Sequence, residues 1–420
     1  MAVTLSQFAS DLHVESAFTV LAMAQKLMAQ GKRVIELEIG DSPFPSTKAA
    51  TAAGIAAIEA GQTRYCPSAG LPAFREAAAQ FVASEYGIPA TADNIIAGHG
   101  AKVFELLFCE AFLNPGDGVL VFGPYFPTYL PNIARRGARP WIADLQQRHA
   151  FRPQLADVEK FLADDPRPKA IFLNSPHNPT GGVTTPDDLR GIADLIRGRD
   201  IAIFSDEPYD RMVWEGRHHS IAAQPDMLNQ TVAAYTFSKS YSMSGWRIGF
   251  AVTSPALANT LAGLINTSLS CAPPFVQMAG QAALLHDADE RNANMRAFHG
   301  KVRRLVDGLN AIDGVRCLMP AGTFYAFPNV KSICNRLAIT SHGLALYLLA
   351  GADDRLGVAC LGGECFGEAG AGFLRFSCAQ SDEAIEEAIA FLPDAVSRQE
   401  QVARFLSQSP EHRLPRPYHE

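Results

Sequence analysis

The stretch Val232-Ala233-Ala234-Tyr235-Thr236-Phe237-Ser238-Lys239-Ser240 joins an apolar run to a lysine set among small hydroxyl residues. The run at its start has the composition of a buried strand. A lysine just beyond such a strand is in an unusual place for a solvated amine. Burial and nearby cations favour the neutral amine, whose lone pair can form a Schiff base. Lys239 is therefore a candidate catalytic lysine, and a plain surface lysine is the alternative that this stretch leaves open.

An arginine follows shortly afterwards, in the segment Gly245-Trp246-Arg247-Ile248-Gly249. An unpaired guanidinium between apolar neighbours is costly, so we expect an anion to meet Arg247. Phosphate is the natural candidate, because a guanidinium binds it through two hydrogen bonds. A salt bridge to a carboxylate is the alternative reading of this segment.

Similar apolar runs recur along the chain and alternate with helical stretches. Strand-like runs lie at 94–97, 118–122, 170–173 and 201–204, and helices are expected at 71–86 and 186–197. Strands that alternate with helices are typical of a parallel sheet covered by helices on both faces. The sequence therefore predicts an α/β fold.

The pattern changes from about residue 286. A charged helix is expected at 289–310, short strands around 324–327 and 372–375, and a last helix from residue 382. We interpret 46–285 as a large domain and 286–408 as a smaller α+β domain. Residues 1–45 form an N-terminal arm that belongs in part to the smaller domain. Residues 409–420, with three prolines, are expected to be poorly ordered.

Composition narrows the class of protein. With 420 residues, 48% of them hydrophobic and 19% charged, the chain suits a folded two-domain protein. A net charge of −7 argues against nucleic acid as a partner. No apolar run has the length of a membrane span, and no signal peptide is recognisable, so we expect no membrane contact and a cytoplasmic location. The eight cysteines show no C-x-x-C spacing, and neither disulfides nor a metal site are expected.

Two further strand ends carry polar side chains. Asp206 and Tyr209 follow the run at 201–204, and Asn178 follows the run at 170–173. Ligands of open α/β sheets bind at the carboxyl ends of the strands. There, Asp206 can keep a pyridinium nitrogen protonated, Tyr209 can reach the same ligand, and Asn178 can donate to a phenolate oxygen. Turn or helix-cap roles are the alternatives.

A third strand end, Gly98-His99-Gly100-Ala101-Lys102, opens a helix. Glycine-rich backbone at a helix N-terminus offers clustered N–H donors that suit a phosphate. The spacing is not that of a P-loop, so the signal is weak taken alone. Phe126, after the run at 118–122, offers an aromatic face that can stack on a planar cofactor, or simply pack in the core.

Eight motifs occur in one order over most of the chain. They are Ile39-Gly40-Asp41-Ser42-Pro43-Phe44, Tyr65-Cys66-Pro67-Ser68-Ala69-Gly70-Leu71, Asn114-Pro115-Gly116-Asp117, 174–181, 205–209, Ser238-Lys239, 245–249 and Phe373-Leu374-Arg375-Phe376. In this set and order the chain resembles the class I/II aminotransferases of fold type I, the aspartate aminotransferase superfamily. The resemblance implies a large cofactor-binding domain, with a mostly parallel sheet of the seven-stranded type between helices, and a smaller α+β domain.

The resemblance implies pyridoxal 5′-phosphate as cofactor and gives roles to residues of this chain. Lys239 would be the Schiff-base lysine and general acid and base, and Asp206 would pair with the pyridine nitrogen. Asn178 and Tyr209 would contact the ring hydroxyl, and Phe126 would stack on the ring. The phosphate would be held by Gly100, Ala101, Lys102, Ser238, Arg247 and Tyr65 of the partner subunit, and the substrate by Gly40, Asn178, Arg375 and Lys102.

The implied activity is transfer of an amino group between an L-amino acid and a 2-oxo acid by a ping-pong mechanism. The family also implies a homodimer with shared active sites. A lyase that performs β-elimination on sulfur amino acids, or a cyclising enzyme, would use the same residues on the same scaffold, and both alternatives stay open. A regulator that binds the cofactor and DNA is disfavoured by the negative charge.

Substrate identity is the least determined property. Lys102 resembles the lysine with which one bacterial subgroup binds the distal carboxylate of a dicarboxylic substrate, so aspartate or glutamate is an expected partner. A solvent-facing lysine at a helix start is the alternative. Pro208 departs from the family pattern and bears on substrate identity more than on chemistry. Further candidates for the mouth of the site are His13, Phe18 and His99.

Overall fold

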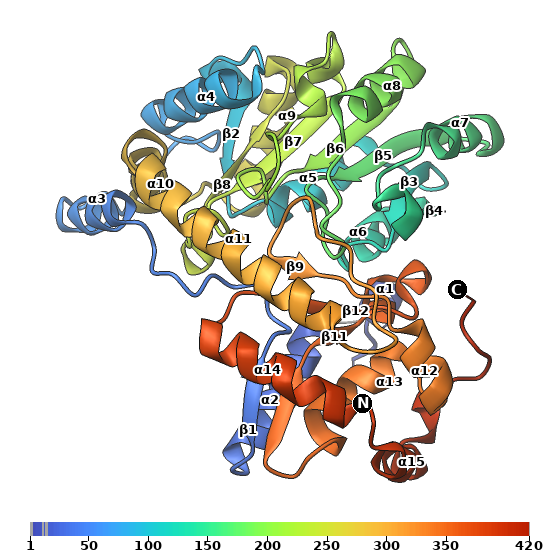
Figure 1. Ribbon diagram of the computed structural model, residues 1–420. Coiled ribbons are helices and arrows are strands. Elements are labelled where there is room, and N and C mark those ends of the chain that lie inside the picture. The colour runs from blue at the N-terminus through green and yellow to red at the C-terminus, as the bar shows by residue number, and fades with distance from the viewer. Residues whose placement is uncertain (1–2, 11, 13–15, 420) are drawn as a thin grey trace.

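The apolar runs form one seven-stranded sheet at the centre of the larger lobe (Figure 1). The computed structural model describes residues 3–10, 12 and 16–419. The strand order is β2-β8-β7-β6-β5-β3-β4, in which β8 is antiparallel to both neighbours and the other pairs are parallel. The strands are β2 (Ile95–Gly98), β3 (Gly118–Gly123), β4 (Arg139–Asp144), β5 (Pro168–Asn174), β6 (Ala202–Asp206), β7 (Thr231–Thr236) and β8 (Gly249–Val252). The predicted α/β fold with a mostly parallel sheet is confirmed.

Two strands of this sheet were not predicted from the sequence. Strand β4 lies at the edge of the sheet and most of its residues are exposed, so it is not an apolar run. Strand β8 is buried but short, and it begins at Gly249, the last residue of the Arg247 segment. The apolar pattern of β8 therefore overlaps the 245–249 motif and was not recognised as a separate strand.

Successive residues of a strand point to opposite faces of the sheet and meet different helices. Ile171 and Ile203 pack with α7 and α8, whereas Phe172 and Phe204 pack with α5 and α9 on the other face. The first face is covered by α4 (Pro72–Tyr86), α7 (Leu155–Asp164), α8 (Pro186–Ile196) and α10 (Pro274–His286), and the second by α5 (Lys102–Phe112), α6 (Tyr129–Arg135) and α9 (Pro255–Ser268). Helix α3 (Lys48–Glu59) packs on α10.

The smaller lobe is joined to the larger one by the long helix α11 (Ala288–Asn310) (Figure 1). Its antiparallel sheet has the order β11-β12-β9, and a separate parallel pair joins β1 to β10. The strands are β1 (Arg33–Glu36), β9 (Tyr325–Ala326), β10 (Leu356–Ala359), β11 (Leu361–Gly362) and β12 (Leu374–Ser377). The helices are α2 (Ser16–Ala29), α12 (Lys331–Leu337), α13 (Ser341–Leu346), α14 (Asp382–Ala395) and α15 (Gln399–Gln408), and α1 (Gln7–Ser10) precedes them all.

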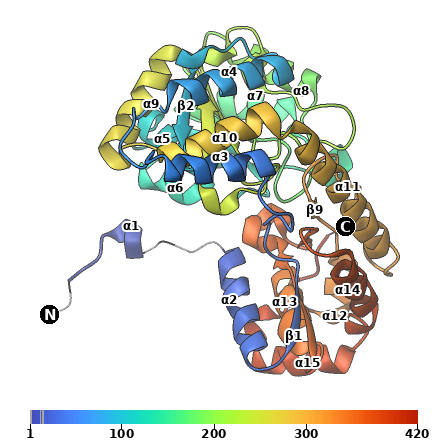
Figure 2. The same ribbon diagram turned by 90° about the vertical axis from the view of Figure 1, so that its left-hand side faces the viewer.

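The pairing of β1 with β10 ties the N-terminal segment to the smaller lobe, as Figure 2 shows for α2 and β1. The division of the chain into an N-terminal arm and two domains stays an interpretation, as do the exact boundaries at residues 45 and 285.

The C-terminal tail differs from the expectation of a poorly ordered segment. The backbone of Tyr418 donates to Asn335 Oδ1 at 2.7 Å and accepts from Asn335 Nδ2 at 3.0 Å. The Tyr418 hydroxyl donates to Glu364 at 2.9 Å, and its ring packs against the core of the smaller lobe. The prolines suggested disorder, but one aromatic side chain and these hydrogen bonds dock the tail.

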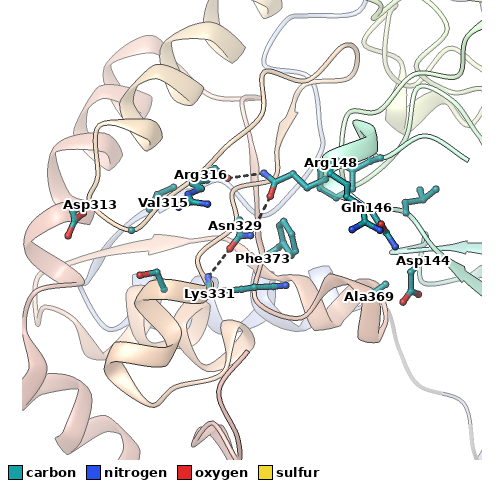
Figure 3. Close-up of a pocket in the computed structure, with 15 residues that line it drawn as sticks. Asp144, Gln146, Arg148, Asp313, Val315, Arg316, Asn329, Lys331, Ala369 and Phe373 are labelled. Atoms are coloured by element: carbon teal, nitrogen blue, oxygen red, sulfur yellow. Dashed lines mark hydrogen bonds between the residues drawn. The ribbon is translucent and has the colours of Figure 1, made fainter. Parts of the chain in front are cut away.

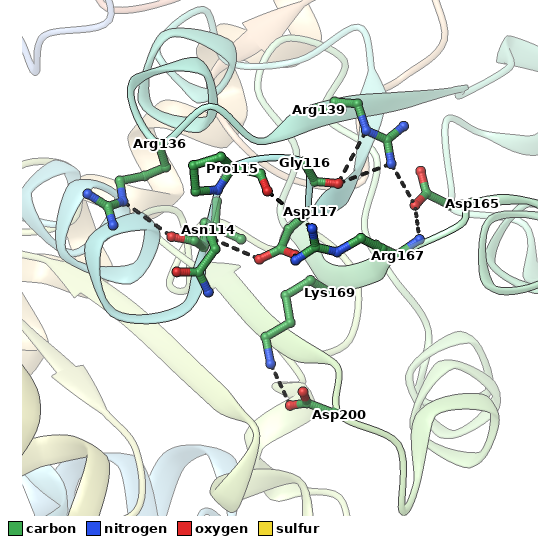
Figure 4. Close-up of polar contacts among 11 residues, drawn as sticks. Asn114, Pro115, Gly116, Asp117, Arg136, Arg139, Asp165, Arg167, Lys169 and Asp200 are labelled. Atoms are coloured by element: carbon green, nitrogen blue, oxygen red, sulfur yellow. Dashed lines mark hydrogen bonds and ion pairs between the residues drawn. The ribbon is translucent and has the colours of Figure 1, made fainter.

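One motif of the resemblance, Asn114-Pro115-Gly116-Asp117, forms the turn between α5 and β3 (Figure 4). Because β3, β5 and β6 are parallel, this turn lies at the end of the sheet opposite Asp206. The buried Asp117 carboxylate accepts from the backbone N–H of Asn114 at 2.8 Å and from Arg167 at 2.8 Å. Nearby, Asp165 accepts from Arg139 at 3.1 Å. This motif therefore contributes to folding rather than to chemistry.

We expect the Asp117→Ala variant to lower the free energy of unfolding by about 1–3 kcal/mol, because it removes a buried carboxylate that accepts from the Asn114 backbone N–H and from the Arg167 guanidinium. Urea denaturation followed by circular dichroism measures this difference. The matched control is Asp200→Ala, which removes the exposed partner of Lys169 and should change stability by less than about 1 kcal/mol. Equal effects of the two variants would contradict a special role for the turn.

Candidate active site

A cavity of about 470 Å³ lies at the carboxyl ends of β5, β6 and β7, where the larger lobe meets residues of the smaller one. Most of the residues predicted from the sequence line it. They are Gly40, Ala101, Lys102, Phe126, Asn178, Asp206, Tyr209, Ser238, Lys239, Arg247 and Arg375. Gly100 lies next to the cavity, directly before Ala101, and Tyr65 does not line it. Residues far apart in sequence thus converge on one pocket.

Lys239 projects into the pocket from the turn after β7. Its Nζ atom donates to the carbonyl oxygen of Gly40 at 2.6 Å. The same Nζ lies 5.8 Å from the ring centre of Tyr209 and 5.7 Å from that of Phe324. Because Gly40 follows β1, this hydrogen bond joins the two lobes across the pocket.

Asp206 ends β6 and is buried. The hydroxyl of Tyr129 donates to Asp206 Oδ2 at 2.6 Å. Burial raises the pKa of Asp206 to about 6, although the Tyr129 hydrogen bond and the cations of Lys102 and Lys239 oppose this rise. The carboxyl is therefore mostly ionised at neutral pH, and it can hold a cationic group.

Arg375 lies buried on β12, with its guanidinium between the rings of Tyr325 and Phe366, at 4.3 and 4.9 Å from their centres. It donates to Asn178 Oδ1 at 3.0 Å and to the carbonyl oxygen of Glu38 at 2.5 Å. Its Nε atom is buried and has no partner among the described residues. The acceptors of Arg375 among the described residues are thus neutral, and a buried cation of this kind suits a carboxylate ligand.

The candidate phosphate site lies where α5 begins. The first N–H groups of a helix have no intrahelical acceptor, and those of α5 start at Lys102. Gly100 has φ of +82°, and a Cβ atom there would lie 2.6 Å from Arg247 Nη2. Arg247 donates to the carbonyl oxygens of Ser244 at 2.8 Å and His99 at 3.1 Å. It forms no ion pair within the described part of the chain, so the alternative of a salt bridge is not observed.

Three residues of this region were missed from the sequence. Tyr325 lines the pocket and its hydroxyl lies 3.0 Å from that of Tyr209. The Tyr129 hydroxyl donates a hydrogen bond to Asp206, and nothing in the sequence indicates this contact. Glu105 lines the pocket from α5, and a carboxyl within an otherwise apolar helix face was a signal that could have found it.

The remaining candidates fall in different places. Phe18 and Pro208 line the pocket. His99 lines a neighbouring hollow instead, and burial lowers its pKa. His13 lies outside the described residues.

Another hollow, of about 680 Å³, lies between the η2 turn of the larger lobe and the smaller lobe (Figure 3). Its lining includes Arg148, Arg316, Asn329 and Phe373. Gln147 bridges the lobes there by donating to the carbonyl oxygen of Arg316 at 3.2 Å. None of the residues assigned a role in the sequence analysis lines this hollow.

Neither a metal site nor a membrane-spanning helix is evident in the described residues. No group of three or more His, Cys, Asp and Glu side chains there is placed to hold a metal ion. In the same residues, no helix combines the length and the apolar character needed to cross a bilayer.

Residues 32–392 match the sequence model of the family aminotransferase class I and II. The chain belongs to this family. It is 34% identical over 396 residues to a probable aspartate/prephenate aminotransferase of Aquifex aeolicus, which covers 93% of this chain and 98% of that protein. It is 30% identical to an arginine–pyruvate transaminase of Pseudomonas aeruginosa over 89% of this chain and 92% of the other. The solved structure of Thermus thermophilus aspartate aminotransferase with maleate matches with a TM-score of 0.87 and 28% identity, covering 94% of this chain and all of that one.

Membership makes this protein a transaminase and implies pyridoxal phosphate as its cofactor. The lyase alternative is not favoured, because these relatives are named as amino-group transferases. The pocket fits such a cofactor: it combines an amine, an ionised carboxyl, and a helix start beside a guanidinium.

We expect Gly100→Ala to weaken pyridoxal phosphate binding by about tenfold or more, because the new Cβ atom displaces the Arg247 guanidinium and strains a left-handed backbone. Fluorescence titration of the cofactor-free protein measures the dissociation constant. The control is Gly87→Ala, which has a similar positive φ of +70° but open space around it. The interpretation fails if both variants bind the cofactor as wild type does.

Proposed function

We propose that this aminotransferase carries pyridoxal phosphate on Lys239 and transfers the amino group of an acidic L-amino acid to a 2-oxo acid in a ping-pong reaction. The observation that carries the proposal is the convergence of Lys239, Asp206 and Arg375 in one pocket. These residues provide the three groups that the reaction needs: an amine, an anion for the ring nitrogen, and a cation for the substrate carboxylate.

The residues around the pocket have complementary tasks toward the cofactor. Asp206 would hold the ring nitrogen as a carboxylate, Phe126 would offer its face to the ring, and the NH₂ group of Asn178 and the hydroxyl of Tyr209 would bind the ring hydroxyl. Gly100, Ala101, Lys102, Ser238 and Arg247 would hold the phosphate. When bound, pyridoxal phosphate supplies an electron sink for the negative charge that develops at the substrate Cα atom.

Lys239 acts on the proton of the substrate. Its Nζ atom lies 2.6 Å from the Gly40 carbonyl oxygen, beside the place proposed for the substrate carboxylate. With substrate in the pocket, the Nζ atom of Lys239 would remove the proton from Cα as a general base. Arg375 and the Gly40 backbone would hold the substrate carboxylate and so orient Cα toward Lys239.

An acidic substrate is supported by Lys102 and by the relatives. Lys102 lines the pocket with its Nζ atom 5.0 Å from the centre of the Phe126 ring, so it adds a cation to those of Arg375, Arg247 and Lys239. Several relatives are named as aspartate aminotransferases, and one solved relative is described with the dicarboxylate maleate. We therefore propose that aspartate or glutamate is one substrate.

A homodimer is supported by an exposed apolar surface. Ile55 and Ile58 on α3 are 52% and 51% exposed, and Tyr65, in the loop that follows α3, is 89% exposed. Such side chains rarely gather on a surface that stays in water. We propose that a second copy covers this surface and that Tyr65 reaches the phosphate in the partner's pocket. The cytoplasmic location stays a prediction.

The test of the reaction is the visible absorbance of the purified protein before and after addition of glutamate, in wild type and in Lys239→Ala. We expect wild type to show the absorbance of a cofactor joined to a lysine, and to lose it as 2-oxoglutarate forms. Lys239→Ala should lack the lysine-linked absorbance and lose at least about 10³-fold in activity. Formation of pyruvate and ammonia from an amino acid without a 2-oxo acid would contradict transamination, and a protein that binds no cofactor would contradict the whole proposal.

The test of the dimer is sedimentation equilibrium of wild type and of an Ile55→Glu and Ile58→Glu double variant. We expect a dimer for wild type and a shift toward monomer for the variant, because two buried charges at an interface are costly. The control is Met319→Glu, a charge on an exposed apolar residue elsewhere, which should stay dimeric. A monomeric wild type at micromolar concentration would disprove the shared site.

A further inference from the structure

Glu105 is a buried carboxyl in the wall of the pocket, and the proposed reaction has no task for it. It is 1% exposed and lies on α5 among the buried side chains of Phe104, Leu107 and Phe108. Burial of a carboxyl is costly unless its oxygens find hydrogen-bond donors. The partners of Glu105 therefore indicate what it does.

Both partners belong to the start of α6. Thr128 Oγ1 donates to Glu105 Oε2 at 2.8 Å, and Asn132 Nδ2 donates to Oε1 at 2.5 Å. Tyr129 lies between these two residues in the chain, and its hydroxyl donates to Asp206 Oδ2 at 2.6 Å. A chain of hydrogen bonds thus runs from Glu105 through the first turn of α6 to Asp206.

Helix α6 needs such an anchor. It is seven residues long, and Thr128, at its N-cap position, makes no capping hydrogen bond to the helix. Helices of this length are marginal without tertiary contacts, because the nucleation of a helix is unfavourable. The two hydrogen bonds to Glu105 fix the turn that carries Tyr129.

We propose that Glu105 is a positioning residue for Asp206, in that it holds the first turn of α6 so that the Tyr129 hydroxyl stays on the Asp206 carboxylate. The inference deepens the proposed function and depends on it, because Asp206 matters as the partner of the cofactor ring. A hydrogen bond donated to a carboxylate favours its ionised form. Loss of the anchor therefore makes Asp206 easier to protonate.

Charged and titratable groups from several elements surround Asp206 and Glu105. Asp206 is faced by Tyr129 from α6, by its neighbour Glu207, by Lys102 from α5 and by Lys239. Glu105 is faced by Asp206 and Lys102, and burial raises its pKa to about 8 against the two donated hydrogen bonds. The proton affinity of Asp206 thus depends on Tyr129, on the anion of Glu207 and on two lysines. The carboxyls of Glu105 and Asp206 also interact directly, but this charge coupling is weak while Glu105 is protonated, so on the acid side Glu105 acts mainly through Tyr129.

The test compares the holoenzymes of wild type, Glu105→Gln, Tyr129→Phe and the double variant. Two quantities are measured: the dissociation constant of pyridoxal phosphate, and the acid-side midpoint of the kcat/KM profile against pH. We expect Tyr129→Phe to raise the dissociation constant about fivefold and the midpoint by about half a pH unit, as loss of one hydrogen bond implies. Glu105→Gln should change both in the same direction by a smaller amount, and the double variant should equal Tyr129→Phe alone.

The control is Glu110→Gln on the same helix. Glu110 pairs with Arg136 at 3.1 Å, at the opposite end of α6, so it should leave both quantities as in wild type. If Glu105→Gln does not fold, Thr128→Val removes one donor from the same carboxyl and should give the same shifts. Additive effects of Glu105→Gln and Tyr129→Phe, or unchanged values in Glu105→Gln, would overturn the inference. Failure of the proposed function would instead show as a wild type without cofactor absorbance.

Discussion

The parallel alignment of β5, β6 and β7 is the constraint on which the rest of the site depends. Parallel strands end at the same edge of a sheet, and here the register sets Asn174 opposite Asp206. Asn174 Nδ2 donates to the Asp206 carbonyl oxygen at 2.8 Å and fixes the loop that leads to Asn178. The turn after β7 then brings Lys239 to the same edge. One geometric rule thus gathers residues from three distant segments.

The pocket is completed by the smaller lobe, which supplies the groups that the sheet does not provide. Gly40 lies in the segment after β1, and Arg375 lies on β12. Each makes a hydrogen bond with a residue of the larger lobe. The substrate carboxylate in the proposed function would therefore lie between the lobes. Any motion of one lobe against the other would change the distance between Lys239 and its substrate, so the two contacts link fold and chemistry.

Much of this arrangement follows from local sequence. The apolar runs predicted five strands of the central sheet, and Lys239, Asp206 and Asn178 were recognised because each comes just after such a run. The edge strand β4 was missed because it is largely exposed and carries no apolar run. The tail was expected to be disordered, since no local pattern shows that Tyr418 docks on Glu364 and Asn335.

The sequence by itself determined the family, the α/β class and the residue types of the pocket, because strand periodicity and motif order are properties of neighbouring residues. Only the tertiary structure decided which buried charges share partners. Glu105, Tyr129 and Asp206 are separated by 24 and 77 residues along the chain, yet one chain of hydrogen bonds joins them through α6. Such contacts depend on how helices pack on the sheet, and the spacing of residues along one segment does not reveal them.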